Sequence, residues 1–220
     1  MLRFIYRRLL LMIPTLFVIS VVSFVIIQLP PGDYITRYMN RLAEEQALAI
    51  GQKLDALGFA WFEEPIPAAE IDGYARLCAA LETPVTGGES LTTLEQFRPY
   101  LERHAYDIVQ PDVGLCGISE AMRIAQVAHR YGVDLCPHSW HNGLMAVENA
   151  HLVAALPHPR VLELCMIQGP LQWAILAERP LVEDGWLSLP TGPGLGVRLA
   201  EDLEERYPYI EGHYAVQVTR

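Results

Sequence analysis

Five short apolar segments recur along the chain at a nearly constant spacing, and this regularity restricts the fold more than any other feature. They start 25, 23, 26 and 27 residues apart and read FAWFE (59–63), PVTGG (84–88), DIVQP (107–111), VDLCP (133–137) and RVLEL (160–164). Stretches with the apolar spacing of amphipathic helices lie between them, at residues 71–82, 92–104, 117–132 and 143–156. Strands and helices that alternate at this period predict βα units on a parallel sheet.

The number of units separates two architectures. A closed TIM-type (β/α)₈ barrel needs eight βα units, and the sequence supplies about five, so we expect an α/β fold that forms part of such a barrel. An open, doubly wound sheet is the alternative. A helix before the first unit, within residues 47–60, would end at Gly58 as its C-cap. Thr92 with Glu95 predicts a capping box at the start of the helix within 92–104.

Each predicted strand is followed or closed by an ionisable side chain. In chain order these are Glu63, Glu89, Asp112, His138 and Glu163. Taken singly, each is explained by a solvated loop acid or by a histidine at the edge of the core. The carboxyl ends of barrel strands build the active site, so five such residues in succession predict one common site.

An uncharged apolar run occupies residues 9–29, after an arginine-rich start. At about 1.5 Å per residue it is long enough to cross a bilayer core of about 30 Å, which predicts one N-terminal transmembrane helix and a membrane location. The preceding arginines predict a cytoplasmic N-terminus. A buried core helix is the alternative, whereas a signal peptide is disfavoured because QLPPGD follows in place of a small-residue cleavage site.

The charge of the remaining chain excludes one class of partner. Residues 46–220 hold 11 basic and 23 acidic side chains, which argues against nucleic acid and is compatible with a divalent cation. The four cysteines have no CxxC spacing, so neither a zinc site nor a disulfide framework is expected, and the barrel part reads as a cytoplasmic type. Lys53 is the only lysine.

Two resemblances to known families divide the chain. Residues 1–45, MLRFIYRRLLLMIPTLFVISVVSFVIIQLPPGDYITRYMNRLAEE, resemble the first membrane segment of oligopeptide/dipeptide ABC transporter permeases. The motifs WFEEPIP, GGES, QPDVGLCGISEAMRIAQVAHRYGVDLCPHSWHNG and LEL resemble the barrel of the enolase superfamily, mandelate racemase/muconate lactonizing subgroup, and particularly its sugar-acid dehydratases. This second resemblance covers about residues 46–215. It implies a partial barrel over residues 46–175 and, over residues 176–220, a segment that returns toward the capping region.

The enolase resemblance implies a role for each strand-end residue. Glu63 and Glu89 match two carboxylates that bind Mg²⁺, which prefers oxygen ligands. His138 matches the general base, Asp112 its dyad partner, and Glu163 an acid that hydrogen-bonds the developing enediolate. The implied reaction is proton abstraction next to a carboxylate, leading to dehydration or racemisation of a sugar acid.

Two neighbours of these residues have less certain roles. We interpret His141 as a loop residue at the mouth of the site, with the role of base as the alternative. We interpret Glu64 as a supporting residue, with substrate contact as the alternative. Pro65 turns the chain away from the strand, since proline cannot continue the hydrogen-bond ladder.

The subgroup's third metal carboxylate and its lysine base have no counterpart here, because Lys53 lies in a helical stretch and not at a strand end. We therefore expect a hybrid chain whose site is recognisable but inactive as it stands. Exposed edges of a parallel sheet would also favour self-association. Two other functions stay open: a membrane-anchored permease fragment, and a metal-binding or scaffold module without catalysis.

Overall fold

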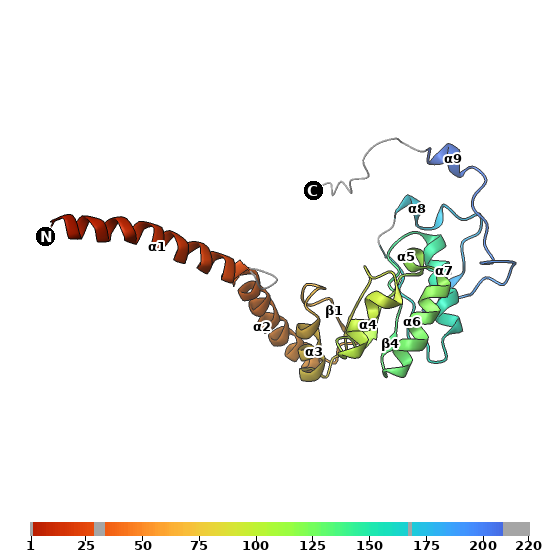
Figure 1. The fold of residues 1–220 in the computed structure, drawn as a ribbon. Helices are drawn as coiled ribbons and strands as arrows, with labels where there is room; N and C mark the ends of the chain where they lie inside the picture. The colour runs from red at the N-terminus through yellow and green to blue at the C-terminus, as the bar shows by residue number, and fades with distance from the viewer. Residues whose placement is uncertain (1, 29–33, 167–168, 209–220) are drawn as a thin grey trace.

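The computed structural model describes residues 2–28, 34–166 and 169–208 (Figure 1). Two long helices come first: α1 (Leu2–Gln28) extends away from the rest of the molecule, and α2 (Tyr34–Leu57) leads into it. The guanidinium of Arg76 on α3 (Ile71–Ala80) donates to both carboxylate oxygens of Glu44, each at 2.6 Å. This bidentate ion pair connects α2 to α3, the first helix of the strand–helix part of the chain.

The structure does not support the transmembrane span predicted over residues 9–29. In the described part of the chain, no helix has both the length and the apolarity needed to cross a membrane. Residue 29 and the side chains of residues 9, 11 and 25–28 lie outside the described part. Apolar side chains that are described on α1, such as Phe17 and Phe24, are exposed and do not form the buried helix considered as the alternative.

The body alternates strands and helices as the spacing predicts. Its elements are β1 (Phe62–Glu63), α3, β2 (Val85–Gly87), α4 (Leu94–Glu102), β3 (Ile108–Val109), α5 (Val113–Cys116), α6 (Ile118–Arg130), β4 (Asp134–Leu135) and α7 (Gly143–Ala155). The four strands are parallel and lie in the order β1-β2-β3-β4. A doubly wound sheet would reverse its strand order at a switch point, so the sequential order corresponds to an arc of a barrel and not to the open alternative.

The register of the strands divides their side chains between two faces. Val85, Val109 and Leu135 face the helices and belong to the main hydrophobic core. Phe97 of α4 and Tyr74 of α3 complete this core and are fully buried. Because side chains alternate along a strand, Glu63, Thr86 and Ile108, which are paired in register, share the opposite face. That face points to the interior of the barrel arc.

The fifth predicted strand is not formed. Residues 160–164 have no regular structure, although they lie beside β4. The carbonyl of Val161 accepts from the Cys136 thiol at 3.3 Å, and Arg160 pairs with Asp134 at 2.7 Å. Contacts through side chains therefore join this segment to β4 and the residue after it, whereas a strand would have been joined by backbone hydrogen bonds.

The capping box of α4 lies one residue later than predicted. Thr93, not Thr92, is the N-cap, and its hydroxyl accepts from the Gln96 N–H at 3.4 Å. The Gln96 side chain accepts in return from the Thr93 N–H at 3.3 Å. Since Gln serves as well as Glu at this position, two overlapping Thr-x-x-Glu/Gln patterns compete, and packing of the helix selects the second.

The C-terminal segment folds back on α7. It contains α8 (Pro170–Trp173), α9 (Leu203–Arg206) and an antiparallel hairpin of β5 (Val182–Glu183) and β6 (Trp186–Leu187). Positive φ angles at Asp184 and Gly185, 49° and 80°, match the two-residue turn that an Asp-Gly pair favours. A small second core of Val147, Ile175 and Leu176 joins the segment to α7.

Candidate active site

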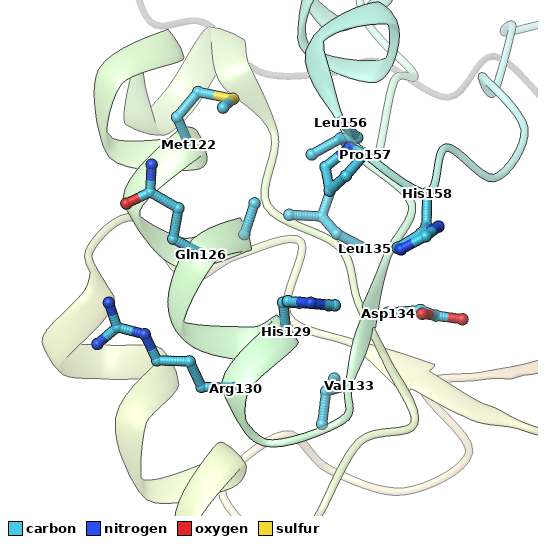
Figure 2. Close-up of a pocket in the computed structure, with 11 residues that line it drawn as sticks. Met122, Gln126, His129, Arg130, Val133, Asp134, Leu135, Leu156, Pro157 and His158 are labelled. Carbon is cyan, nitrogen blue, oxygen red and sulfur yellow. The ribbon is translucent and has the colours of Figure 1, made fainter.

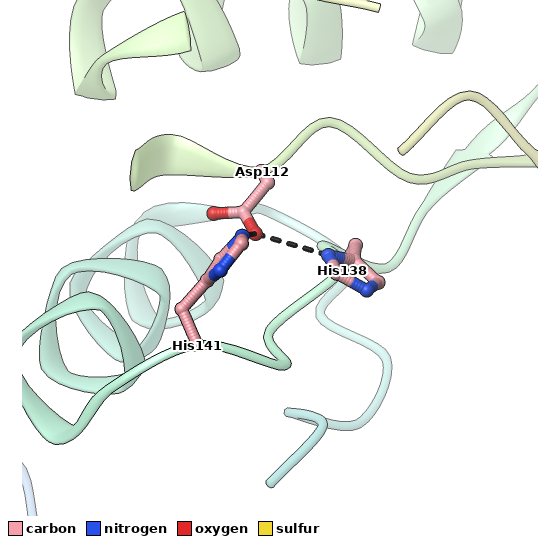
Figure 3. A group of neighbouring side chains, drawn as sticks. All are labelled: Asp112, His138 and His141. Carbon is pink, nitrogen blue, oxygen red and sulfur yellow. Dashed lines mark hydrogen bonds and ion pairs between the residues drawn. The ribbon is translucent and has the colours of Figure 1, made fainter. Parts of the chain in front are cut away.

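Asp112 and His138 meet at the carboxyl ends of β3 and β4. Asp112 lies three residues after β3, as the N-cap of α5, and His138 lies three residues after β4. Nδ1 of His138 lies 3.0 Å from Oδ2 of Asp112 (Figure 3). Parallel strands end at the same edge of a sheet, so the two predicted dyad residues are brought within hydrogen-bond distance by adjacent strands.

Asp112 is completely buried, and each of its oxygens has partners. Oδ1 accepts from the Gly114 N–H at 2.9 Å and from the Asn149 amide at 3.2 Å. Oδ2 lies 3.0 Å from His138 and also 3.1 Å from Nε2 of His141. The carboxylate is thus bounded on every side by donors, which removes the cost of burying its charge.

These contacts shift both pKa values of the dyad. Burial acts to raise the pKa of Asp112, but the hydrogen bonds from His138, Gly114 and Asn149 together with the His141 charge outweigh it, so this pKa lies below its usual value. The hydrogen bond to Asp112 raises the pKa of His138 against the opposing effect of burial, and the charges of Glu89 and Glu163 add to the rise. The dyad therefore favours an imidazolium next to a carboxylate.

Three glutamates act on His138 through their charge: Glu89, Glu64 and Glu163. Oε2 of Glu89 lies 3.3 Å from Nε2 of His138. Glu63 is exposed and accepts from the Trp61 indole at 3.0 Å, while Glu64 accepts from the Gly88 N–H at 3.3 Å. Burial, followed by repulsion from Glu89 and Glu63, raises the pKa of Glu64 even though the bond from Gly88 opposes the rise. The site therefore concentrates negative charge.

Glu163 reaches the site from the irregular segment that follows α7. Its two oxygens accept from the Gln110 amide and from the Ser139 N–H, both at 3.3 Å. Burial and the charge of Glu63 raise its pKa. The residue occupies the predicted place although the strand that was expected to carry it is not formed.

The donor set fits a hard divalent cation in part. Glu63 and Glu89 lie on neighbouring strand ends and offer carboxylate oxygens, the ligands that Mg²⁺ prefers. Burial is the largest cause of the raised pKa values of Glu64 and Glu163, and repulsion from neighbouring glutamates adds to it.

Three polar residues make contacts in the site that the sequence pattern did not indicate. His141, predicted as a loop residue at the mouth of the site, also contacts Asp112 directly. Asn149, in the otherwise apolar interior of α7, donates to Asp112 and to the His138 carbonyl at 3.1 Å. Gln110, fully buried, holds Glu163. A buried amide among alanines and leucines was the signal for Asn149, since such groups are normally hydrogen-bonded.

Other features lie apart from this constellation. A cavity of about 260 Å³ opens between α6 and the turn after α7, where His129 and His158 approach each other (Figure 2). None of the five predicted site residues lines it. Lys53 is exposed on α2, on the outside of the barrel arc.

Comparison with known proteins agrees with this geometry. The family model "Enolase C-terminal domain-like" matches residues 38–203. The chain is 37% identical over 164 residues to arabinonate dehydratase of Saccharolobus solfataricus, covering 74% of this chain and 44% of that protein. It is 32% identical over 166 residues to D-galactarolactone cycloisomerase of Agrobacterium fabrum, covering 71% and 44%.

A solved structure gives the same result. The mandelate racemase/muconate lactonizing enzyme from a Sulfitobacter species superimposes with a TM-score of 0.70 at 33% identity, covering 77% of this chain and 43% of that one. The chain thus spans less than half the length of each of these proteins. The family match leaves most of residues 1–45 uncovered, and their resemblance to a permease stays a prediction.

Proposed function

The chain belongs to the enolase C-terminal domain-like family, in its mandelate racemase/muconate lactonizing branch, and on this basis we propose that it carries the His–Asp half of a sugar-acid dehydratase site. The observation that carries the proposal is the 3.0 Å contact between His138 and Asp112 at adjacent strand ends. A sugar acid is the proposed substrate, in line with the names of the relatives. Residues 46–175 would form the catalytic part, and residues 176–220 the segment that packs against it.

His138 is the proposed base. Asp112 accepts its Nδ1–H, which fixes the tautomer and leaves Nε2 for the proton on the carbon next to the substrate carboxylate. In a dehydration, the hydroxyl on the next carbon leaves as water after His138 returns the proton to it. The resulting enol becomes a 2-keto-3-deoxy acid. Without a leaving group, proton return to the same face of that carbon gives exchange, whereas racemisation needs a proton delivered to the opposite face.

Glu63 and Glu89 are the proposed Mg²⁺ ligands. When bound, the ion supplies positive charge for the substrate carboxylate and for the negative charge that develops as the proton leaves. In its protonated form, which burial favours, Glu163 would donate a hydrogen bond to the same developing charge. Glu64 would orient the Gly88 backbone beside Glu89.

The chemistry of this chain would be one-sided. The only lysine lies on α2, away from the strand ends, so a lysine does not supply a base opposite His138. Proton abstraction and return on the His138 face need no second base. The second function that we consider is metal binding without turnover. The lack of a lysine base opposite His138 favours it.

The test incubates the full chain with Mg²⁺ and a panel of aldonic and aldaric acids in D₂O. Proton NMR reports exchange at the carbon next to the carboxylate, and a carbonyl reagent reports the keto acid. We expect exchange for at least one acid, with or without keto acid, and its loss in His138→Gln. His129→Gln, a change at an exposed histidine outside the site, is the matched control. Exchange that persists in His138→Gln contradicts the proposal, and so does the absence of exchange with every acid.

A further inference from the structure

We propose that Asp112, His138 and His141 form a second metal site, one that takes a divalent transition ion such as Zn²⁺, Co²⁺ or Ni²⁺. Each of the three side chains offers one ligand atom, and these atoms lie within 4.8 Å of one another. Among the described residues, no other group of three or more His, Cys, Asp or Glu side chains comes as close together. Two imidazoles and one carboxylate are a common ligand set for such metals. The site is distinct from the oxygen ligands Glu63 and Glu89.

The distances from Asp112 to the two histidines are compatible with a shared metal ion as well as with hydrogen bonds. Oδ2 of Asp112 lies 3.0 Å from Nδ1 of His138 and 3.1 Å from Nε2 of His141. With bonds of about 2.0–2.2 Å, neighbouring ligands of one ion lie about 3.0–3.4 Å apart. Figure 3 shows both rings turned toward the same carboxylate oxygen. An ion would displace any proton that joins a ring nitrogen to Asp112, so its binding would be coupled to proton release.

The contacts around the trio are those that orient metal ligands. A ligating histidine usually donates its other ring N–H to a carboxylate. Once Nδ1 of His138 holds an ion, its Nε2–H faces Oε2 of Glu89 at 3.3 Å. The second oxygen of Asp112 is already held by the Gly114 N–H and by Asn149. Little reorganisation is therefore needed before an ion can bind.

Access and charge also favour binding. Asp112 is fully buried, but the His141 side chain is 39% exposed and gives a route from solvent. The neighbouring glutamates add negative charge. Imidazole nitrogens select transition ions over Mg²⁺, which prefers oxygen. An ion at this site would occupy the His138 nitrogen that holds the dyad together, so it would oppose the proposed base function.

A second pair of histidines does not offer an equivalent site. The rings of His129 and His158 lie 5.8 Å apart at the cavity of Figure 2. Asp134, the neighbouring carboxylate, is engaged by Arg160 through two nitrogens, at 2.7 and 2.8 Å. Two imidazoles alone would bind an ion more weakly than the trio. The pair therefore provides a matched control.

The experiment titrates the full chain, freed of metals with a chelator, with Co²⁺ and follows its visible absorption. We expect one saturable equivalent that survives an excess of Mg²⁺. His141→Gln should weaken this binding at least about tenfold, whereas the double change His129→Gln with His158→Gln should leave it unchanged. A thermal melt of each variant checks its fold, and the exposure of His141 makes the single change mild.

Three outcomes of the cobalt titration without Mg²⁺ would overturn the site. They are the absence of a saturable band, an unchanged affinity in His141→Gln, and loss of the band in the double variant of His129 and His158. No substrate is used, so a failure here is distinct from a failure of the proposed dehydratase function. A cobalt band that Mg²⁺ displaces would place the ion at Glu63 and Glu89, and would also contradict the proposal.

Discussion

Asn149 of α7 holds Asp112 from the side opposite the histidines: its amide nitrogen lies 3.2 Å from Oδ1, inside a fully buried contact. The same nitrogen lies 3.1 Å from the His138 carbonyl, and its own oxygen accepts from the Val113 N–H at 3.1 Å. One side chain thus connects both members of the dyad to the helix that follows them. The geometry of the site depends on α7 as much as on the strands.

Asn149→Leu should therefore be strongly destabilising. The change keeps the approximate volume but leaves the Val113 N–H without its acceptor and removes one donor from Asp112. Buried groups left unpaired cost about 1–3 kcal/mol each, so we expect the free energy of unfolding in urea to fall by about 2–4 kcal/mol. Gln126→Ala, at an exposed position on α6, is the control and should stay within about 0.5 kcal/mol of the parent. Equal stabilities for the two variants would contradict this account.

His138 should stabilise the fold in a pH-dependent way. Its pKa is higher in the folded chain than in the unfolded one, mainly because of the bond to Asp112. Its contribution is therefore complete below the unfolded value of about 6.5 and is lost as the pH rises through the folded value. We expect the difference in unfolding free energy between the parent and His138→Gln to be larger at pH 6 than at pH 9. A difference that grows with pH would show that the imidazolium is not the favoured form.

Glu64 should have the opposite effect. Burial and the neighbouring acids raise its pKa, so its ionised form costs stability at neutral pH. Glu64→Gln can still accept from the Gly88 N–H, but it carries no charge. We expect the variant to be more stable than the parent at pH 8 and the difference to shrink as the pH falls through the folded pKa toward 4. Thermal melts at the two pH values give the comparison, and a less stable variant at pH 8 would contradict it.

The start of α4 distinguishes two capping boxes. Thr93→Ala removes the N-cap hydroxyl and should cost about 1 kcal/mol of unfolding free energy. Glu95→Ala removes only an acidic group near the helix N-terminus, which is worth about 0.3–1 kcal/mol at most on an exposed surface. Chemical denaturation of both variants measures the difference. The sequence-based assignment to Thr92 and Glu95 would be restored if Glu95→Ala were the more costly change.

Most of the fold could be predicted because the pattern of strands and helices is local. Val85, Val109 and Leu135 alternate with residues of the other face, and this period of two already marks the strands β2, β3 and β4. The segment RVLEL (160–164) is also apolar enough to be predicted as a strand, but it does not form one in the described structure. Strand formation needs a partner in register, and here the carbonyl of Val161 is taken by the Cys136 thiol. Composition cannot reveal that competition.

The sequence by itself determined which chemical groups come to the carboxyl edge of the sheet. Parallel strands end on one side, so Glu63, Asp112 and His138 had to converge once the βα period was read. Only the tertiary structure decided how they pair. That Asp112 contacts two histidines, and that Asn149 donates to it from α7, depends on distances between residues 26 to 37 positions apart. Such distances arise from packing of helices on the sheet, which no local pattern encodes.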